Sequence, residues 1–201
     1  MSRGVTAAAA LARLREGNAR FAADTRSLGA LLTAERRAAL AAAQEPFAIV
    51  LGCSDSRVPV EIVFDQGPGD LFVIRVAGNI VAPSLIGSVE FAADRFGTRL
   101  VVVLGHSSCG AIAATLEEMR RPSANQSPNL KDIVDRIRPA VTGIGDEHEA
   151  MRANILASVQ QLRHGSRTIE GLVARDGLVV VGAWYELETG RVRFLEETLA
   201  P

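Results

Sequence analysis

Four short runs of apolar residues restrict the fold of this chain more than any other feature of its sequence. They read FAIVLG at 47–52, LFVIRVAG at 71–78, LVVVLG at 100–105 and GLVVVGAW at 177–184. Each run is rich in β-branched residues and lacks polar–apolar alternation, which is typical of strands buried on both faces. We therefore predict a central, mostly parallel sheet that is flanked by helices.

The segments between these runs have the patterns of helices. Helices are expected at Leu85 to Phe96, Ala111 to Arg120, Leu130 to Val141, Glu147 to Arg163 and Ser166 to Arg175. Strands that alternate with helices favour an α/β domain. The stretch from Arg121 to Asn129, rich in Pro, Ser and Asn, is predicted to be a loop.

The two ends of the chain extend this domain. Thr6 and Thr33 are suited to cap helices that run to about Ala23 and Ala43, which would form an N-terminal helical arm over residues 1–45. After the turn at Thr189-Gly190, the sequence VRFLEE is able to pair as an antiparallel edge strand. No repeat or linker divides the sequence, so we predict a single domain over residues 1–201.

The composition argues against several classes of protein. The formal net charge is −1, so electrostatics give no reason to expect nucleic acid or an anionic membrane as a partner. The apolar runs are too short to cross a bilayer. Only two cysteines are present, which excludes a disulfide scaffold and favours metal binding or chemistry in a reducing compartment. We expect a cytoplasmic protein.

Two of the predicted strands are followed directly by polar residues. Cys53, Asp55 and Arg57 follow the first run, and His106 and Cys109 follow the third. Ligands bind beyond the carboxyl ends of parallel strands, so both sets are predicted to lie at one edge of the sheet. The spacing of three between His106 and Cys109, at a helix start, would let their side chains converge. Cys53 reaches that point only if the first and third strands are neighbours.

Two thiolates and one imidazole form a ligand set that suits zinc, and we predict one zinc ion per chain on Cys53, His106 and Cys109. Three protein ligands leave one tetrahedral position for water, as in catalytic zinc sites. Two thiolates offset the charge of the ion, so this water should be harder to ionise than one on three histidines. Asp55 is placed to accept a hydrogen bond from the water, and Arg57 to hold that carboxylate by a bidentate pair.

The motif CSDSRVP, followed later in the chain by GHSSCGA, resembles the β-class carbonic anhydrases in residue types and spacing. LREGNARF, FDQGPGDLFVIRVAGN and GSVEFA match that family as well, so the resemblance spans nearly the whole chain. It implies zinc ligands at Cys53, His106 and Cys109, and a catalytic dyad of Asp55 and Arg57. It also implies the reversible hydration of carbon dioxide to bicarbonate and a proton by zinc-bound hydroxide.

The same resemblance suggests further properties. Gln44 matches a glutamine that binds substrate in one of two subclasses, and Phe72 matches an apolar wall residue of the substrate pocket. Ala77 stands where a Val often occurs, and Phe91 where a Tyr often occurs. The family forms dimers, often paired into tetramers, with N-terminal helices that reach the partner. We therefore expect a homodimer or a dimer of dimers, with residues 1–45 packing on the partner subunit.

Alternatives remain open at this point. Relatives of the family hydrolyse carbon disulfide or carbonyl sulfide at the same kind of site, and a non-catalytic zinc protein with this fold is also conceivable. A disulfide between Cys53 and Cys109 would leave His106 without a role. Arg75 lies in an otherwise apolar run and is expected to form a salt bridge at a subunit contact.

Overall fold

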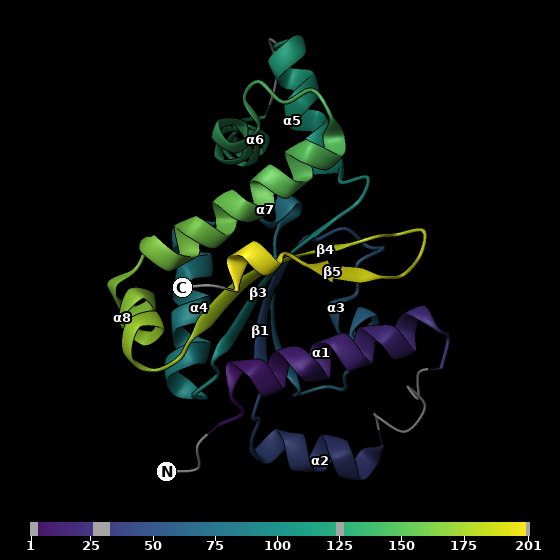
Figure 1. Ribbon diagram of the computed structural model, residues 1–201, viewed down its shortest axis with the longest axis vertical. Coiled ribbons are helices and arrows are strands. Elements are labelled where there is room, and N and C mark those ends of the chain that lie inside the picture. The colour runs from purple at the N-terminus through teal and green to yellow at the C-terminus, as the bar shows by residue number, and fades with distance from the viewer. Residues whose placement is uncertain (1–3, 26–32, 124–126, 200–201) are drawn as a thin grey trace.

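The computed structural model describes residues 4–25, 33–123 and 127–199. Over these residues the strands form one five-stranded sheet in the order β2-β1-β3-β4-β5 (Figure 1). The strands are β1 (Ala48–Gly52), β2 (Leu71–Arg75), β3 (Leu100–His106), β4 (Val179–Tyr185) and β5 (Val192–Phe194). The first four pair in parallel, and β5 pairs antiparallel with β4. The predicted α/β fold with its antiparallel edge strand is confirmed.

Helices pack on both faces of this sheet. They are α1 (Ala7–Ala22), α2 (Ala34–Ala42), α3 (Val60–Val63), α4 (Pro83–Arg95), α5 (Gly110–Arg120), α6 (Pro128–Val141), α7 (Glu147–His164) and α8 (Arg167–Arg175), with 3-10 turns η2 (Ala77–Asn79) and η3 (Glu196–Thr198). The long helix α7 packs on β3 and β4, and α1 packs on α3 and β3 (Figure 1). Among the described helices none is both long and apolar enough to span a membrane.

The central strand β3 shows why its sequence lacks alternation. All of its residues are buried, because both of its faces carry core. Val101 and Val103 belong to the hydrophobic cluster that includes α7 residues, whereas Val102 and Leu104 belong to the cluster that includes Leu14 of α1. A separate layer of helices therefore packs on each face of the sheet. The apolar run is continuous because residues that point to either face are buried.

The N-terminal helices begin where the sequence predicts. The Thr6 hydroxyl accepts a hydrogen bond from the Ala9 N–H at 3.3 Å, and the Thr33 hydroxyl accepts one from the Arg36 N–H at 3.2 Å. Within this chain α1 packs on its own sheet, where Leu14 is fully buried. The proposed contact of residues 1–45 with a partner subunit stays a prediction.

Three local elements differ from the sequence predictions. The run at 71–78 is not one strand, because β2 ends at Arg75 and residues 77–79 turn as η2. The short helix α3 was not predicted. Helix α6 begins at Pro128, inside the stretch predicted as a loop, since proline is well suited to the first turn of a helix. Residues 124–126 of that stretch lie outside the described part.

Candidate metal centre

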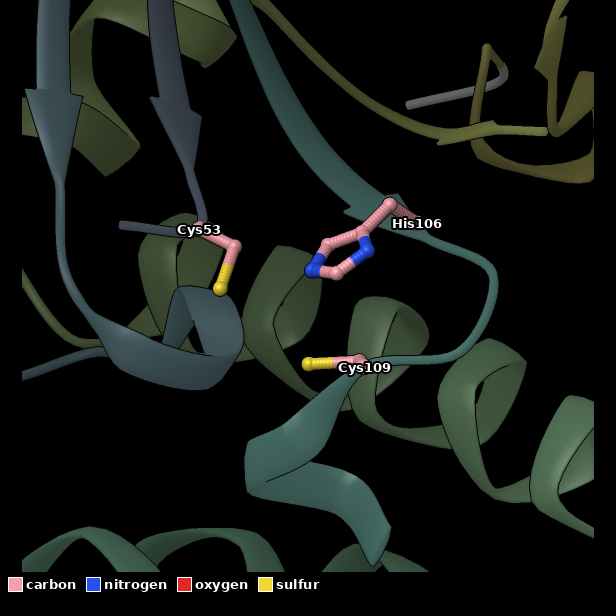
Figure 2. Close-up of side chains that lie close together, drawn as sticks. All are labelled: Cys53, His106 and Cys109. Atoms are coloured by element: carbon pink, nitrogen blue, oxygen red, sulfur yellow. The ribbon is translucent and has the colours of Figure 1, made fainter. Parts of the chain in front are cut away.

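Parallel pairing brings the two polar motifs to one edge of the sheet. Strands β1 and β3 are direct neighbours, with Gly52 beside Leu104, so the chain leaves both strands at the same level. The ligand atoms of Cys53, His106 and Cys109 lie within 4.8 Å of one another, and all three residues are buried. Figure 2 shows their two sulfurs and the imidazole ring pointing into a common space. The condition set by the sequence, that the first and third strands be neighbours, is met.

The convergence of His106 and Cys109 has a different cause from the helical spacing that the sequence suggested. His106 is the last residue of β3, where it pairs with Tyr185 of β4, and it does not lie on a helix. The chain then turns through Ser108, which has a positive φ of 54°, and Cys109 is the N-cap of α5. A tight strand-to-helix turn therefore brings the two side chains together.

The protonation of the His106 ring supports metal binding through Nε2. Its Nδ1 lies 2.9 Å from the Ser107 carbonyl oxygen, which can only accept, so Nδ1 carries the proton. Nε2 is buried and has no hydrogen-bond partner among the described residues. A buried acceptor without a donor is costly, and a metal ion would satisfy it. The donor set of this site therefore fits zinc.

Both cysteines are free thiols, and their environments differ. A hydrogen bond with Cys109, together with weaker ones from His106 and two backbone N–H groups, lowers the pKa of Cys53 to about 4 against the opposing effect of burial. The same interaction, with burial, raises the pKa of Cys109. Burial lowers the pKa of His106, but the neighbouring Cys53 and other groups raise it by more. The three groups therefore lie close enough to shift one another's pKa, in a space that one cation could share.

Asp55 and Arg57 form a bidentate ion pair beside this group. The Arg57 Nε donates to Asp55 Oδ1 at 2.9 Å, and its Nη2 donates to Oδ2 at 2.8 Å. These hydrogen bonds hold the pKa of Asp55 well below its ordinary value. The Asp55 Oδ2 lies 3.9 Å from His106 Nε2, so the carboxylate is adjacent to the three candidate ligands. Arg57 also donates to the Ser108 carbonyl at 3.1 Å, which links the two motifs.

Arg75 makes contacts within this chain that the sequence did not predict, whereas its expected salt bridge at a subunit contact stays a prediction. It is the last residue of β2 and lies beside Gly52 in the register. Its Nε donates to the Cys53 carbonyl at 3.0 Å, and its Nη2 donates to the Asp55 carbonyl at 2.6 Å. Within this chain the guanidinium therefore holds the backbone of the first motif, a role the sequence analysis missed. The signal in the sequence that could have indicated this role was a single arginine in an otherwise apolar run.

The residues predicted to line a substrate pocket lie in different places. Ala77 is in η2, next to Gly78, whose N–H donates to Cys53. Phe72 pairs with Ile49 near the beginning of β1, so it lies away from the edge that carries the cysteines. Gln44 is exposed and precedes β1, whereas Cys53 follows this strand of five residues, roughly 16 Å long.

Phe91 belongs to a small aromatic group on the surface. Its ring centroid lies 6.2 Å from that of Phe72 and 5.8 Å from that of Phe96. Phe91 is 54% exposed, which is unusual for a large apolar side chain in a packed group. Within one chain, only Ala77 of the four predicted pocket residues is brought next to the candidate metal ligands; the substrate role of all four stays a prediction.

The protein therefore has an α/β fold with a mostly parallel sheet. At the strand ends of this sheet, the buried Cys–His–Cys group forms a candidate metal site with three ligands. The sequence model of the carbonic anhydrase family matches residues 48–192. A carbonic anhydrase of Mycolicibacterium smegmatis is 42% identical over 191 residues, which cover 92% of this chain and 91% of that protein. Carbonic anhydrase 2 of Mycobacterium tuberculosis is 38% identical, with 91% and 90% covered.

Solved structures agree with these sequence matches. A β-carbonic anhydrase of Aspergillus fumigatus superposes with a TM-score of 0.69 at 25% identity, covering 96% of this chain and 94% of that one. One of two tetrameric β-carbonic anhydrases of Sordaria macrospora gives a TM-score of 0.69 at 25% identity, with 79% and 85% covered. The chain belongs to the β-carbonic anhydrase family, as its two motifs suggested.

Proposed function

We propose that this protein is a zinc-dependent carbonic anhydrase that catalyses the reversible hydration of carbon dioxide to bicarbonate and a proton. The observation that carries the proposal is the convergence of Cys53, His106 and Cys109 in a chain of this family, because three ligands leave a fourth position open. When bound, zinc supplies a Lewis acid that lowers the pKa of a coordinated water. The remaining chemistry falls to side chains of this chain.

Asp55 is the proposed orienting group, which would accept a hydrogen bond from a water at the metal. Its pKa is held low by Arg57, so it is ionised at neutral pH and acts as a hydrogen-bond acceptor. Two oxygens accept from Arg57, and the lone pairs that remain can orient a water on the metal side. Arg57 fixes the carboxylate and Arg75 fixes its backbone, so the acceptor is held in one position before substrate binds.

The proposed substrate pocket needs two copies of the chain. Gln44 and the Phe72–Phe91 group lie away from Cys53 within one copy, so they can serve a metal centre only if an assembly brings them to that of the partner. The tetrameric state of the Sordaria macrospora relatives and the exposure of Phe91 support self-association. We propose a homodimer or a dimer of dimers, in which residues 1–45 of a single zinc domain, 1–201, contact the partner.

A cytoplasmic location also stays a proposal. It is supported by the pair of free cysteines, because thiolate ligands are best preserved in a reducing compartment.

The proposed function is tested by removing and restoring the metal. Purified protein is assayed for zinc content and for carbon dioxide hydration by stopped-flow, then stripped with a chelator and reloaded. We expect about one zinc per chain, loss of activity on stripping and recovery on reloading. Parallel assays with carbon disulfide and carbonyl sulfide separate the neighbouring activities. A zinc-loaded protein that acts only on the sulfur compounds, or on none of the three, would refute the proposal.

A further inference from the structure

The turn η2 connects the candidate metal centre to helix α7 through one residue, Gly78. The Gly78 N–H donates to the Cys53 sulfur at 3.4 Å, and the Gly78 carbonyl accepts from the Asn154 side-chain amide at 2.8 Å. Both hydrogen bonds are buried. One residue of the turn therefore faces a candidate metal ligand with its donor and a helix with its acceptor.

A second hydrogen bond of the same kind lies one helical turn further along α7. The Ser158 hydroxyl donates to the Asn79 carbonyl at 3.1 Å. Asn154 and Ser158 are each 3% exposed, on a helix face that is otherwise packed with apolar residues. Burying a polar side chain in such a face costs free energy unless its hydrogen bonds are made. The hydrogen bonds of these two residues to η2 offset that cost.

The backbone of η2 has an unusual conformation that these hydrogen bonds help to hold. Gly78 has a φ of +70° and Asn79 a φ of +43°, a region that side-chain-bearing residues rarely adopt. A Cβ at residue 78 would lie 2.8 Å from Ile137 Cδ1 and 3.0 Å from Ala111 Cβ, so the left-handed φ and the close neighbours together favour glycine. Such a conformation persists only where the surroundings fix it. The two hydrogen bonds from α7 contribute to this, beside the bond within the turn from the Asn79 N–H to the Val76 carbonyl at 3.1 Å.

We propose that Asn154 is a positioning residue of the metal centre: it holds the Gly78 carbonyl and thereby fixes the backbone conformation in which the Gly78 N–H donates to the Cys53 sulfur. An N–H donor on a thiolate withdraws charge from the sulfur and orients it. This matters at a site with two thiolates, because each one offsets the charge of the metal on which the chemistry depends. The inference rests on the proposed function only in requiring that zinc occupies the site.

The test compares two variants that each delete one buried hydrogen bond from α7 to η2. Asn154→Ala removes the bond to Gly78, and Ser158→Ala removes the bond to the adjacent Asn79. Each zinc-loaded protein is mixed with an excess of chelator, and the zinc release rate is measured beside the thermal unfolding midpoint. We expect Asn154→Ala to release zinc about tenfold faster than the parent, and Ser158→Ala less than about threefold faster, at comparable losses of thermal stability.

The absorption spectrum of the cobalt-loaded protein gives a second readout. It would not change if Asn154 only stabilised the fold. The Cys53 sulfur accepts from the N–H groups of Gly78 and Asp55, each at 3.4 Å, and Asn154→Ala should weaken only the bond from Gly78. In cobalt-loaded protein this weakening makes the sulfur richer in electrons, so the thiolate-to-cobalt absorption band should move to lower energy in Asn154→Ala. Ser158→Ala should keep the parental band. If Asn154→Ala does not fold, Asn154→Ser, which is too short to reach Gly78, carries the same comparison.

Equal zinc release from the two variants, or an unchanged cobalt band in Asn154→Ala, would overturn the proposal. Neither readout uses carbon dioxide. Failure of the positioning role is therefore distinguishable from failure of the proposed function, which would show as inactivity of the zinc-loaded parent.

Discussion

The carboxylate of Asp55 accepts three hydrogen bonds from the single residue Arg57. The backbone N–H and Nε of Arg57 both donate to Oδ1 at 2.9 Å, and Nη2 donates to Oδ2 at 2.8 Å. Because Oδ2 also lies 3.9 Å from His106 Nε2, any movement of this carboxylate would change how close it lies to the three candidate metal ligands. Arg57 is therefore the residue that holds this carboxylate in its observed position.

Arg57→Lys should retain zinc but lower kcat/KM for carbon dioxide hydration by about 10- to 100-fold. Lysine keeps the charge but cannot form the bidentate pair, so Asp55 is no longer held in place. The control is Arg136→Lys, since Arg136 makes a comparable bidentate pair with Asp132 on the surface of α6. Stopped-flow kinetics and zinc analysis check both variants. Equal effects of the two substitutions would contradict the role given to Arg57.

His106→Gln should reduce bound zinc to well below one ion per chain and abolish hydration. Its Nε2 is a buried acceptor that a bound metal would satisfy, and an amide is a poor replacement for a neutral imidazole. His148→Gln alters an exposed histidine and should bind zinc as the parent does. Metal analysis after gel filtration measures the difference. Full zinc occupancy in His106→Gln would remove this residue from the ligand set.

Asp55 should remain ionised as the pH falls through the range in which ordinary aspartates titrate, about 3.9. Its pKa is lower in the folded chain than in the unfolded chain, chiefly because of Arg57. The pair therefore stabilises the fold above the unfolded pKa, and this contribution is lost as the pH falls through the folded value. A nearby zinc ion would lower the pKa further. Carboxyl-carbon NMR checks this, and a midpoint for Asp55 at or above the ordinary value would contradict it.

Phe91→Glu should weaken self-association. Phe91 is 54% exposed although it packs in an aromatic group with Phe72, and an assembly would bury its outer face. Sedimentation across a concentration series should show a smaller species for this variant than for the parent. Leu130→Glu places the same charge on another exposed apolar residue, 58% exposed, and serves as the control. An unchanged sedimentation profile of Phe91→Glu would place the interface elsewhere.

Leu14→Ala should lower the free energy of unfolding by about 2–5 kcal/mol, because it leaves a cavity where α1 meets the sheet. Leu14 is fully buried within its own chain. Leu130→Ala, at an exposed position, should change the free energy of unfolding by less than about 0.5 kcal/mol. Urea unfolding measures both. A negligible effect of Leu14→Ala would indicate that α1 does not belong to the core of its own chain in solution.

Most of the fold was predictable because it depends on local chemistry. β-Branched runs indicated the parallel strands, and Thr6 marked the start of α1. The exceptions have physical causes. η2 interrupts a run that reads as one strand, because Gly78 adopts a left-handed conformation that only its tertiary neighbours require.

The candidate site also has features that the sequence predicted and features that it did not. The sequence by itself determined the donor set, since two cysteines and a histidine placed after buried strands leave little other use for those residues. Only the tertiary structure decided what supports that set, namely Arg75 on the backbone of the first motif and Asn154 on Gly78. It also decided that Gln44 lies at the other end of β1 from Cys53. These relationships join segments distant in the chain through single hydrogen bonds and strand pairing, which leave no periodic pattern in a sequence.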